Sequence, residues 1–491
     1  MPGTLSHRLT TTDAAFLYFE RPHTPLHIGS LAVYEGHISY EGFVAHLGSR
    51  MPLIPRYRQR VASVPLSLAH PTWEDDPDFN IRRHIHHVTL PAPGTDEQLR
   101  ELTTQLFAQP LDRNKPLWEM NIVHGLERNR SAMVSKVHHC MVDGVSGIEL
   151  LVATLDISPQ PAPPPDDDHW TPNPLPSLTE RLTSAFWDNA RQQMSLAREF
   201  QEGVFNPRPR IQQTLDLLRA LNSASEWLVR PVHRTPFSKP VGPERAVAFS
   251  EMSFVEIRQI RTSLGGTVND VVLALLAGAL RKYLLHHGHS VEGWEPRVGI
   301  PVNVRLQDEK GAMGNRISGM MALLPIGEAD PAARLNTIRQ RLEQMKKENQ
   351  SGALELLLRL ASLTPPPIQA LASYGATNSA INLICTNVPG PMIPLYCVGH
   401  LLLSHHPLVP LSMDMGLGVG VTSYNQRLYF GLMADPKAMP DVDLLKECLD
   451  ESFLELRAAA GVAAADLPEL ANVRSSNGEA RASAPVREPA G

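Results

Sequence analysis

The sequence predicts an α/β protein made of two mixed halves that are joined by a helical crossover. Strand-like alternation and helical spacing of apolar residues occur in both parts of the 491-residue chain. Between these parts, residues 158–176 carry eight prolines and an acidic run, a composition typical of a linker. Residues 178–228 then have the pattern of two amphipathic helices. The expected units are 1–157, the linker and crossover 158–240, the second half 241–464 and a disordered tail 465–491.

The expected elements follow from these periodicities. In the first half we expect strands at 31–34 and 132–137 and helices at 40–48 and 96–108. In the second half we expect helices at 255–264, 269–285 and 442–458, and strands at 245–254, 297–302, 381–386, 416–423 and 427–432. Two such halves favour a ligand cleft at their interface.

Composition excludes several classes of protein. A formal net charge of −6 and a pI near 6.4 do not indicate a nucleic-acid-binding protein. The four cysteines lie far apart without CxxC spacing, so we expect neither a zinc ribbon nor a disulfide framework. The amino-terminal residues lack the apolar core of a signal peptide. The apolar run Val271–Leu280 is shorter than the roughly 20 residues that span a membrane. We therefore expect a cytoplasmic protein.

The chemistry-bearing motif is a pair of histidines where an expected strand meets a loop. The strand 132–137 runs into His138 and His139, and Asp143 and Gly144 close the loop before an expected helix at 145–155. Successive strand side chains point to opposite faces, so one histidine faces a given cleft. We assign His139 as reactive and expect His138 to position the loop. A histidine at this place can take a proton from a hydroxyl, while Asp143 orients the loop or a ring and Gly144 permits the turn.

The alternative is that adjacent histidines arise by chance, since the chain has 20 of them. Three other clusters lack an Asp-Gly pair after a three-residue gap, and we interpret them as surface or packing residues: His84, His86 and His87; His286, His287 and His289; and His405 and His406. Metal binding is disfavoured because adjacent strand histidines diverge and no carboxylate pair is spaced to complete a site.

The chain resembles the bacterial wax ester synthase/diacylglycerol acyltransferases of the HHxxxDG CoA-dependent acyltransferase superfamily. The resemblance runs from about Leu9 to Ala458 and rests on seven ordered blocks. These blocks are the opening 9–36, Pro116-Leu117-Trp118-Glu119, His138 to Gly144, Thr267 to Asp270, Pro301 to Arg305, Gly314 to Arg316, and Asn387 to Pro391.

The resemblance implies two chloramphenicol-acetyltransferase-like halves with a tunnel between them. Acyl-CoA would enter from one side as a cosubstrate, with no cofactor, and a fatty alcohol or a diacylglycerol from the other. It also implies that His139 is the general base and that Asp143 is mainly structural. Because acceptor and product are apolar, a peripheral position on the inner membrane or on lipid droplets fits this activity.

The remaining blocks have weaker functional readings. Asn269, near a helix N-terminus, is a candidate donor to the oxyanion of the reaction, whereas Asp270 fits a helix cap after Thr267. For Pro116, Leu117 and Trp118 we expect a structural role that shapes the tunnel. A turn at Asn387, Pro389 and Gly390 could let a bulky cosubstrate approach the backbone. Arg305 and Arg316 are candidates for binding CoA phosphates.

The sequence therefore predicts O-acyl transfer without an acyl-enzyme, because it contains no GxSxG motif and no supported cysteine dyad. Two alternatives remain. One is a condensation-type or polyketide-associated acyltransferase that takes its acyl group from a carrier protein. The other is a lipid-droplet-binding protein whose histidine site is vestigial.

Overall fold

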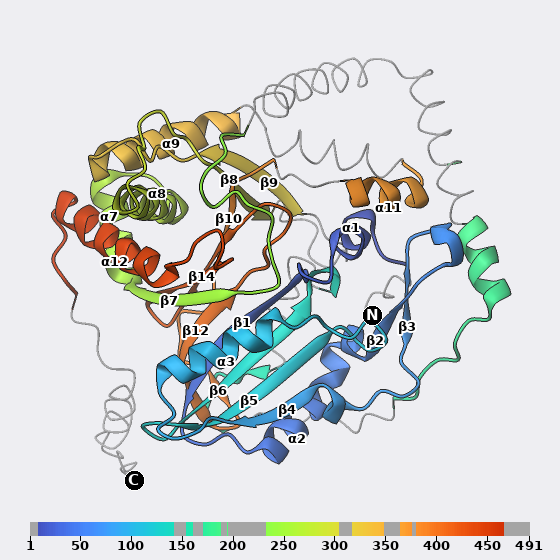
Figure 1. The fold of residues 1–491 in the computed structure, drawn as a ribbon. Coiled ribbons are helices and arrows are strands. Elements are labelled where there is room, and N and C mark those ends of the chain that lie inside the picture. Colours follow the sequence, from blue (N-terminus) through green and yellow to red (C-terminus); the bar gives the residue numbers. More distant parts are fainter. Residues whose placement is uncertain are drawn as a thin grey trace, which may run out of the picture.

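In the part of the chain that the structure describes, two six-stranded mixed sheets lie side by side, with helices on their outer faces (Figure 1). A computed structural model describes residues 8–141, 154–160, 170–187, 194, 232–303, 317–347, 364–375 and 380–465. The expected helix at 145–155, the amphipathic pattern beyond residue 187 and the tail therefore lie almost entirely outside the described residues.

The first sheet has the strand order β11-β12-β1-β6-β5-β4, and only the β4–β5 pair is parallel. Its strands are β1 (His27–Glu35), β4 (Ile85–Thr89), β5 (Trp118–Leu126), β6 (Arg130–His138), β11 (Tyr396–Cys397) and β12 (His400–Leu408). Alternation along β6 sends Ala132 and Val134 into a cluster with α3 (Asp96–Ala108), and Met133 and Val137 into a cluster with α2 (Tyr40–Arg50). The chain between β1 and β4 also forms a two-stranded sheet of β2 (Gln59–Ala62) and β3 (Thr72–Asp75).

The second sheet has the order β7-β14-β13-β10-β8-β9. Its strands are β7 (Ala246–Ser253), β8 (Arg297–Asn303), β9 (Ile317–Leu323), β10 (Leu383–Val388), β13 (Leu417–Tyr424) and β14 (Arg427–Ala434). Four helices gather beside it: α7 (Phe254–Leu264), α8 (Val268–His286), α9 (Pro331–Lys347) and α12 (Val442–Ala459). The apolar run 271–280 lies wholly buried within α8, which explains why it is hydrophobic all round.

One segment from the second half of the chain belongs to the first sheet. Strand β12 pairs with β1 and packs across β13 and β14 of the second sheet. At Gly431 a Cβ would lie 1.8 Å from the carbonyl oxygen of Pro407, so only glycine allows this approach. We expected each half of the chain to form its own sheet, with a boundary at residue 241. The pairing of β12, from the second half, with β1 was therefore not predicted.

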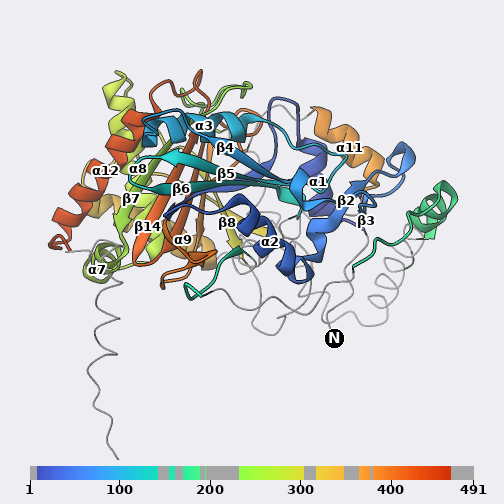
Figure 2. The same ribbon diagram turned by 90° about the horizontal axis from the view of Figure 1, so that it is seen from below.

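Two short helices lie at the other end of the molecule, next to each other: α1 (Thr11–Phe19) and α11 (Pro366–Gly375) (Figures 1 and 2). Single 3-10 turns connect the elements of the first half: η1 (Met51–Leu53), η2 (Pro55–Arg58), η3 (Pro65–Ser67), η4 (Ile81–Arg83) and η5 (His139–Met141). A further helix covers 178–187. None of the described helices is by itself long and apolar enough to cross a bilayer. Helices α7 and α8 together have the required length and apolar composition, but a bend of 98° separates them.

The expected elements that lie in described residues are present, most with ends shifted by one or two residues. Helix α3 begins and ends where its pattern predicts, because a capping box between Thr95 and Gln98 marks its start. The sequence did not predict helices α1, α9 and α11 or strands β2, β3, β4, β9, β11 and β12. In β12 the run His400–Leu408 mixes three histidines with leucines, and neither face shows an alternation.

Candidate active site

The paired histidines end β6, and their backbone is held from two sides. The main-chain N–H of His138 donates to the carbonyl of Leu117 (2.9 Å), and that of His139 donates to the carbonyl of Leu26 (2.9 Å). At His139 the strand gives way to the turn η5. The motif is therefore clamped between the residue before β1 and the residue before β5.

The ring of His139 lies flat against Phe16 of α1. The ring centroids are 3.9 Å apart and the planes make an angle of 10°. Burial lowers the pKa of His139 to about 4, and the neighbouring His138 adds to this, while a contact with the residue's own main-chain carbonyl acts in the opposite direction. The ring is therefore neutral at neutral pH, the state in which it can accept a proton. Its Nδ1 has no hydrogen-bond partner among the described residues.

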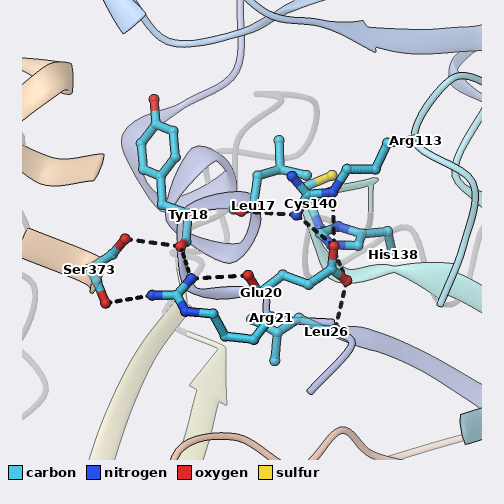
Figure 3. A network of polar contacts seen from close by, with 9 residues as sticks. All are labelled: Leu17, Tyr18, Glu20, Arg21, Leu26, Arg113, His138, Cys140 and Ser373. Atoms are coloured by element: carbon cyan, nitrogen blue, oxygen red, sulfur yellow. Dashed lines mark hydrogen bonds and ion pairs between the residues drawn. The ribbon is translucent and has the colours of Figure 1, made fainter. Parts of the chain in front are cut away.

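The ring of His138 lies on the other face of the sheet. Its cross-strand partner, His27, packs edge-on against Phe107 of α3, and paired residues share a face. The Nδ1 of His138 accepts the N–H of Cys140 (3.2 Å), and its Nε2 lies 3.2 Å from Oε1 of Glu20, the residue that ends α1 (Figure 3). The expectation that His138 positions the loop fits this arrangement.

Cys140 offers no nucleophile. Its side chain is buried, and burial raises the pKa of the thiol well above its usual value, with nearby Asp13 and Glu20 adding to the effect. The thiol stays protonated, so the Cys–His dyad rejected at the sequence level is also disfavoured by its surroundings.

The candidate site lies where the two halves of the chain meet. Helix α11, from the second half, packs on α1. Ser373 of α11 donates its hydroxyl to the carbonyl of Tyr18 (2.9 Å), and Arg21 donates to the carbonyl of Ser373 (2.7 Å) (Figure 3). Helix α1 thus links the histidine motif to a helix far away in the sequence.

Four of the expected site residues lie outside the described residues: Asp143 and Gly144, in the segment 142–153, and Arg305 and Arg316, in the segment 304–316. Their assignments stay predictions.

Leu117 and Trp118 form a packed wall beside the end of β6, with Trp118 on the face of the sheet opposite to the ring of His138. Both are buried, and the indole N–H of Trp118 donates to the carbonyl of Tyr57 (2.8 Å). The ring of Trp118 also stacks on His84, with centroids 4.5 Å apart. Pro116 precedes this wall and accepts the N–H of Trp118 at 2.9 Å. The structural role expected for this block fits these contacts.

Asn269 and Asp270 lie in the first turn of α8. Asp270 closes a capping box at the start of α8: its carboxylate accepts the N–H of Thr267 (2.7 Å), whose hydroxyl accepts the N–H of Asp270 (3.2 Å). Helix α8 packs on α12, α9 and α7. Both ribbon views place the α7–α8 corner at the opposite end of the molecule from α1 (Figures 1 and 2). Helix α8 therefore begins away from α1, and the oxyanion role expected for Asn269 stays a prediction.

The turn after β10 is packed rather than open. Asn387 is still part of β10, and Pro389 and Gly390 follow it. The N–H of Gly390 donates to the hydroxyl of Ser423 (3.0 Å), and a Cβ at Gly390 would lie 2.2 Å from the carbonyl oxygen of Ser423. The glycine is required for the close approach of this turn to β13, so the expected approach of a cosubstrate to its backbone is not needed to explain it.

Sequence reasoning assigned no role to Phe16, Glu20, Leu26 or Arg113, which surround the motif. The opening block contains the first three, but no spacing relates them to residues 138 and 139, because the contacts are tertiary. Among the described residues, no group of three or more His, Cys, Asp or Glu side chains is arranged to hold a metal ion.

Comparisons with known proteins agree on one family. The profile of the wax ester synthase/diacylglycerol acyltransferase catalytic domain matches residues 9–272, and that of the corresponding C-terminal domain matches 313–457. A Mycobacterium tuberculosis protein described as a probable diacylglycerol O-acyltransferase is 30% identical over 466 residues, covering 92% of this chain and 96% of its own. A second protein of that species is 32% identical over 464 residues, covering 91% and 90%.

Solved structures share the fold. The wax ester synthase/diacylglycerol acyltransferase of Marinobacter aquaeolei superposes with a TM-score of 0.63 at 24% identity, covering 93% of this chain and all of that chain. The starter condensation domain of rhizomide synthetase, in complex with C8-CoA and Leu-SNAC, gives a TM-score of 0.59 at 15% identity, covering 93% and 94%. The chloramphenicol-acetyltransferase-like architecture expected from the sequence is confirmed at the level of fold.

Proposed function

Because the chain belongs to the wax ester synthase/diacylglycerol acyltransferase family, we propose that it moves a long-chain acyl group from acyl-CoA to the hydroxyl of an apolar acceptor, with His139 as general base. One observation carries the proposal for His139. Its ring lies in the turn η5 directly after β6, stacked against Phe16, and burial keeps it neutral, with a pKa of about 4. A neutral imidazole held in this way is ready to accept a proton.

In the proposed reaction, His139 removes the hydroxyl proton of the acceptor as the oxygen attacks the thioester carbonyl. The new C–O bond forms, the tetrahedral intermediate collapses and the C–S bond breaks. The proton then passes from His139 to the departing thiolate, which leaves free CoA and an ester. An imidazolium is disfavoured by its buried surroundings, so it gives up this proton readily.

We infer that the acceptor is a diacylglycerol or a fatty alcohol. The descriptions of the two mycobacterial relatives favour diacylglycerol, while the Marinobacter structure carries both activities in its name. Competition between hexadecanol and dioleoylglycerol with purified protein separates them: triacylglycerol as the main product supports the first, and wax ester the second.

Work on an apolar acceptor also suggests contact with a lipid surface. Apolar side chains of α11 are exposed, Leu371 at 72% and Ile368 at 54%. The helix 178–187 exposes Phe186 and Trp187 as well, and both helices lie beside η3 and its neighbours. We propose that this surface rests on a membrane or droplet. In flotation with phosphatidylcholine vesicles, Leu371→Glu should reduce binding, whereas a Leu371→Glu variant that floats like the wild type excludes this surface.

The test of the catalytic proposal is His139→Ala, assayed with palmitoyl-CoA and dioleoylglycerol. Loss of a general base should lower kcat by about 10²- to 10⁴-fold. His86→Ala is a matched control, because His86 is exposed on β4 and should leave kcat unchanged. Full activity in His139→Ala would instead support a vestigial histidine site. Activity that requires a carrier-protein thioester would support the condensation-type alternative.

A further inference from the structure

A buried carboxylate lies behind the histidine motif, and the proposed reaction gives it no role. We propose that Glu20 is a positioning residue for acyl transfer, because it fixes the turn that carries His139 by two separate routes, a short polar contact with the ring of His138 and a hydrogen bond to Leu26. This inference rests on the proposed role of His139 as base.

The first route runs through the ring of His138. Its Nδ1 accepts the N–H of Cys140 (3.2 Å), so the ring proton belongs on Nε2, which lies 3.2 Å from the Glu20 carboxylate. Glu20 thus selects the tautomer whose other nitrogen can accept from Cys140. Since Cys140 follows His139 directly, this bond fixes the backbone on the carboxyl side of the base.

The second route runs through Leu26. The same oxygen of Glu20 accepts the N–H of Leu26 (2.9 Å), and the carbonyl of Leu26 accepts the N–H of His139 (2.9 Å). The main chain of Leu26 is thus held at its N–H and at its carbonyl, and it fixes the backbone of His139 itself. The two routes meet at one carboxylate and hold two consecutive residues of the turn.

Arg113 anchors the carboxylate. Its Nε and Nη2 donate to Oε2 of Glu20 at 3.0 Å and 2.6 Å, and Nη2 also donates to the carbonyl of Leu17 in α1 (3.0 Å) (Figure 3). Burial alone would raise the pKa of Glu20, but its contacts with His138, Leu26 and Arg113 together lower it to about 2. The group therefore stays ionised at working pH, although its side chain is only 9% exposed.

Helix α1 joins this network to the stacking partner of the base. Glu20 ends α1, and Phe16, one turn earlier, lies against the ring of His139. One helix end thus places both the ring face and the backbone of the base. A displacement of the carboxylate should misplace the imidazole relative to the acceptor hydroxyl without touching either substrate.

The main test is Glu20→Gln in the full-length protein. The neutral amide keeps the size of the side chain but loses the charge that pairs with Arg113 and fixes His138. We expect kcat to fall by about 10- to 100-fold, the usual result of a small misplacement of reacting groups. The KM values for palmitoyl-CoA and dioleoylglycerol should stay within about twofold of the wild type, since uniform binding is unchanged.

A spectroscopic signature separates positioning from general weakening of the fold. In protein labelled with ¹⁵N-histidine, the wild-type His138 should show a single Nε2-protonated tautomer. In Glu20→Gln its two ring nitrogens should shift toward values averaged between the tautomers. Glu41→Gln is the matched control, because Glu41 also pairs with an arginine, Arg82, which donates to both of its carboxylate oxygens, and its side-chain partner among the described residues is this arginine rather than a histidine. It should leave both kcat and the spectrum unchanged.

His138→Asn tests the first route alone, in a protein that keeps the pair of Glu20 and Arg113 and the contact with Leu26. An asparagine oxygen can replace Nδ1 as acceptor for Cys140 but does not extend to Glu20, so kcat should fall less than in Glu20→Gln. This variant also serves if Glu20→Gln does not fold. A wild-type kcat in either folded variant overturns the positioning proposal. If His139→Ala remains active, the proposed function fails instead; if His139→Ala is inactive while Glu20→Gln is normal, only the positioning role fails.

Discussion

Phe16 and His139 lie ring against ring, 3.9 Å apart and nearly parallel, although one belongs to the first helix and the other to the turn η5 that follows β6. The aromatic face covers one side of the imidazole and removes water from it. This contact contributes to the burial that lowers the pKa of His139. Several properties of the protein should depend on it.

The fall of kcat/KM on the acid side of the pH profile should occur at an unusually low pH. A base with a pKa of about 4 stays neutral from pH 8 to about pH 5, so kcat/KM should be flat over that range and fall only as pH approaches 4. Initial rates over this range, with circular dichroism at each pH to confirm folding, check the prediction. An acid limb near the ordinary histidine pKa of about 6.5 would contradict it.

Removal of the stacking partner should shift that limb. In Phe16→Ala water reaches the imidazole, so the pKa of His139 should rise toward its ordinary value and the acid limb of kcat/KM should move to higher pH. The loss of an aromatic pair should also cost about 1 kcal/mol of stability. Leu454→Ala is the control, since that side chain is 50% exposed and lies on α12, outside the surfaces proposed to bind lipid. An unchanged pH profile in Phe16→Ala would show that other groups control the pKa.

Stability should decline as the pH falls from about 6.5 to 4. Burial lowers the pKa of His405 and His406 to about 4 each, and burial together with nearby Lys136 lowers that of His27 to about 3. The folded state keeps these rings neutral while the unfolded chain binds protons, so the stability present above pH 6.5 is lost as the pH falls toward the folded-state values. Each ring should cost about 1 kcal/mol at pH 5.5. Urea unfolding at pH 7.5 and 5.5 measures the loss, and His406→Phe should reduce it. Equal stability at both pH values would refute the prediction.

Trp118 should matter for stability more than for catalysis. It is 1% exposed, and its indole is bonded to the carbonyl of Tyr57. Trp118→Ala should lower the free energy of unfolding by about 3–5 kcal/mol. Trp118→Phe should cost about 1–3 kcal/mol, because it leaves a buried carbonyl without its donor. Trp187→Ala, at an exposed tryptophan, should cost almost nothing. Denaturant unfolding measures the free energy of unfolding of the three variants. A smaller loss of stability in Trp118→Ala than in Trp187→Ala would contradict the assignment of Trp118 to the core.

Asn269 and Asp270 should have separable effects. Because the α7–α8 corner lies away from α1, Asn269→Ala should leave kcat within about threefold of the wild type, far less than the roughly 10²-fold cost of losing an oxyanion donor. Asp270→Ala removes one half of the capping box and should cost about 1 kcal/mol of stability with little change in kcat. Rate measurements with matched thermal unfolding check both, and a hundredfold loss in Asn269→Ala would restore it to the site.

Local patterns were reliable where the physical cause is local. The capping boxes at Thr95 and Thr267 place the starts of α3 and α8, since the bonds involved span three residues. The alternation in residues 132–137 predicts β6, and the divergence of His138 and His139 follows from the period of a strand. The alignment of blocks to a family then indicates the reaction.

Long-range contacts were not predictable in this way. Strand β12 joins the first sheet because its pairing with β1 and its close packing on Gly431 become favourable only when both halves are folded. Asn269 is a second example of what local patterns leave open. Its residue type and helix position fit an oxyanion donor, but the packing of α8 on α9 and α12, which places the start of that helix away from α1, could not be seen in the sequence.

The sequence by itself determined which residues could carry the chemistry, because a motif of this kind depends on residue types at fixed spacing along one strand and its loop. Tertiary structure alone decided the protonation state and the surroundings of the base. Its stacking partner and the nearby carboxylate come from α1 and its end, and the groups that hold them come from the segments before β1 and β5. The reason is that a pKa depends on what surrounds a group in space. Distance along the chain carries no such information.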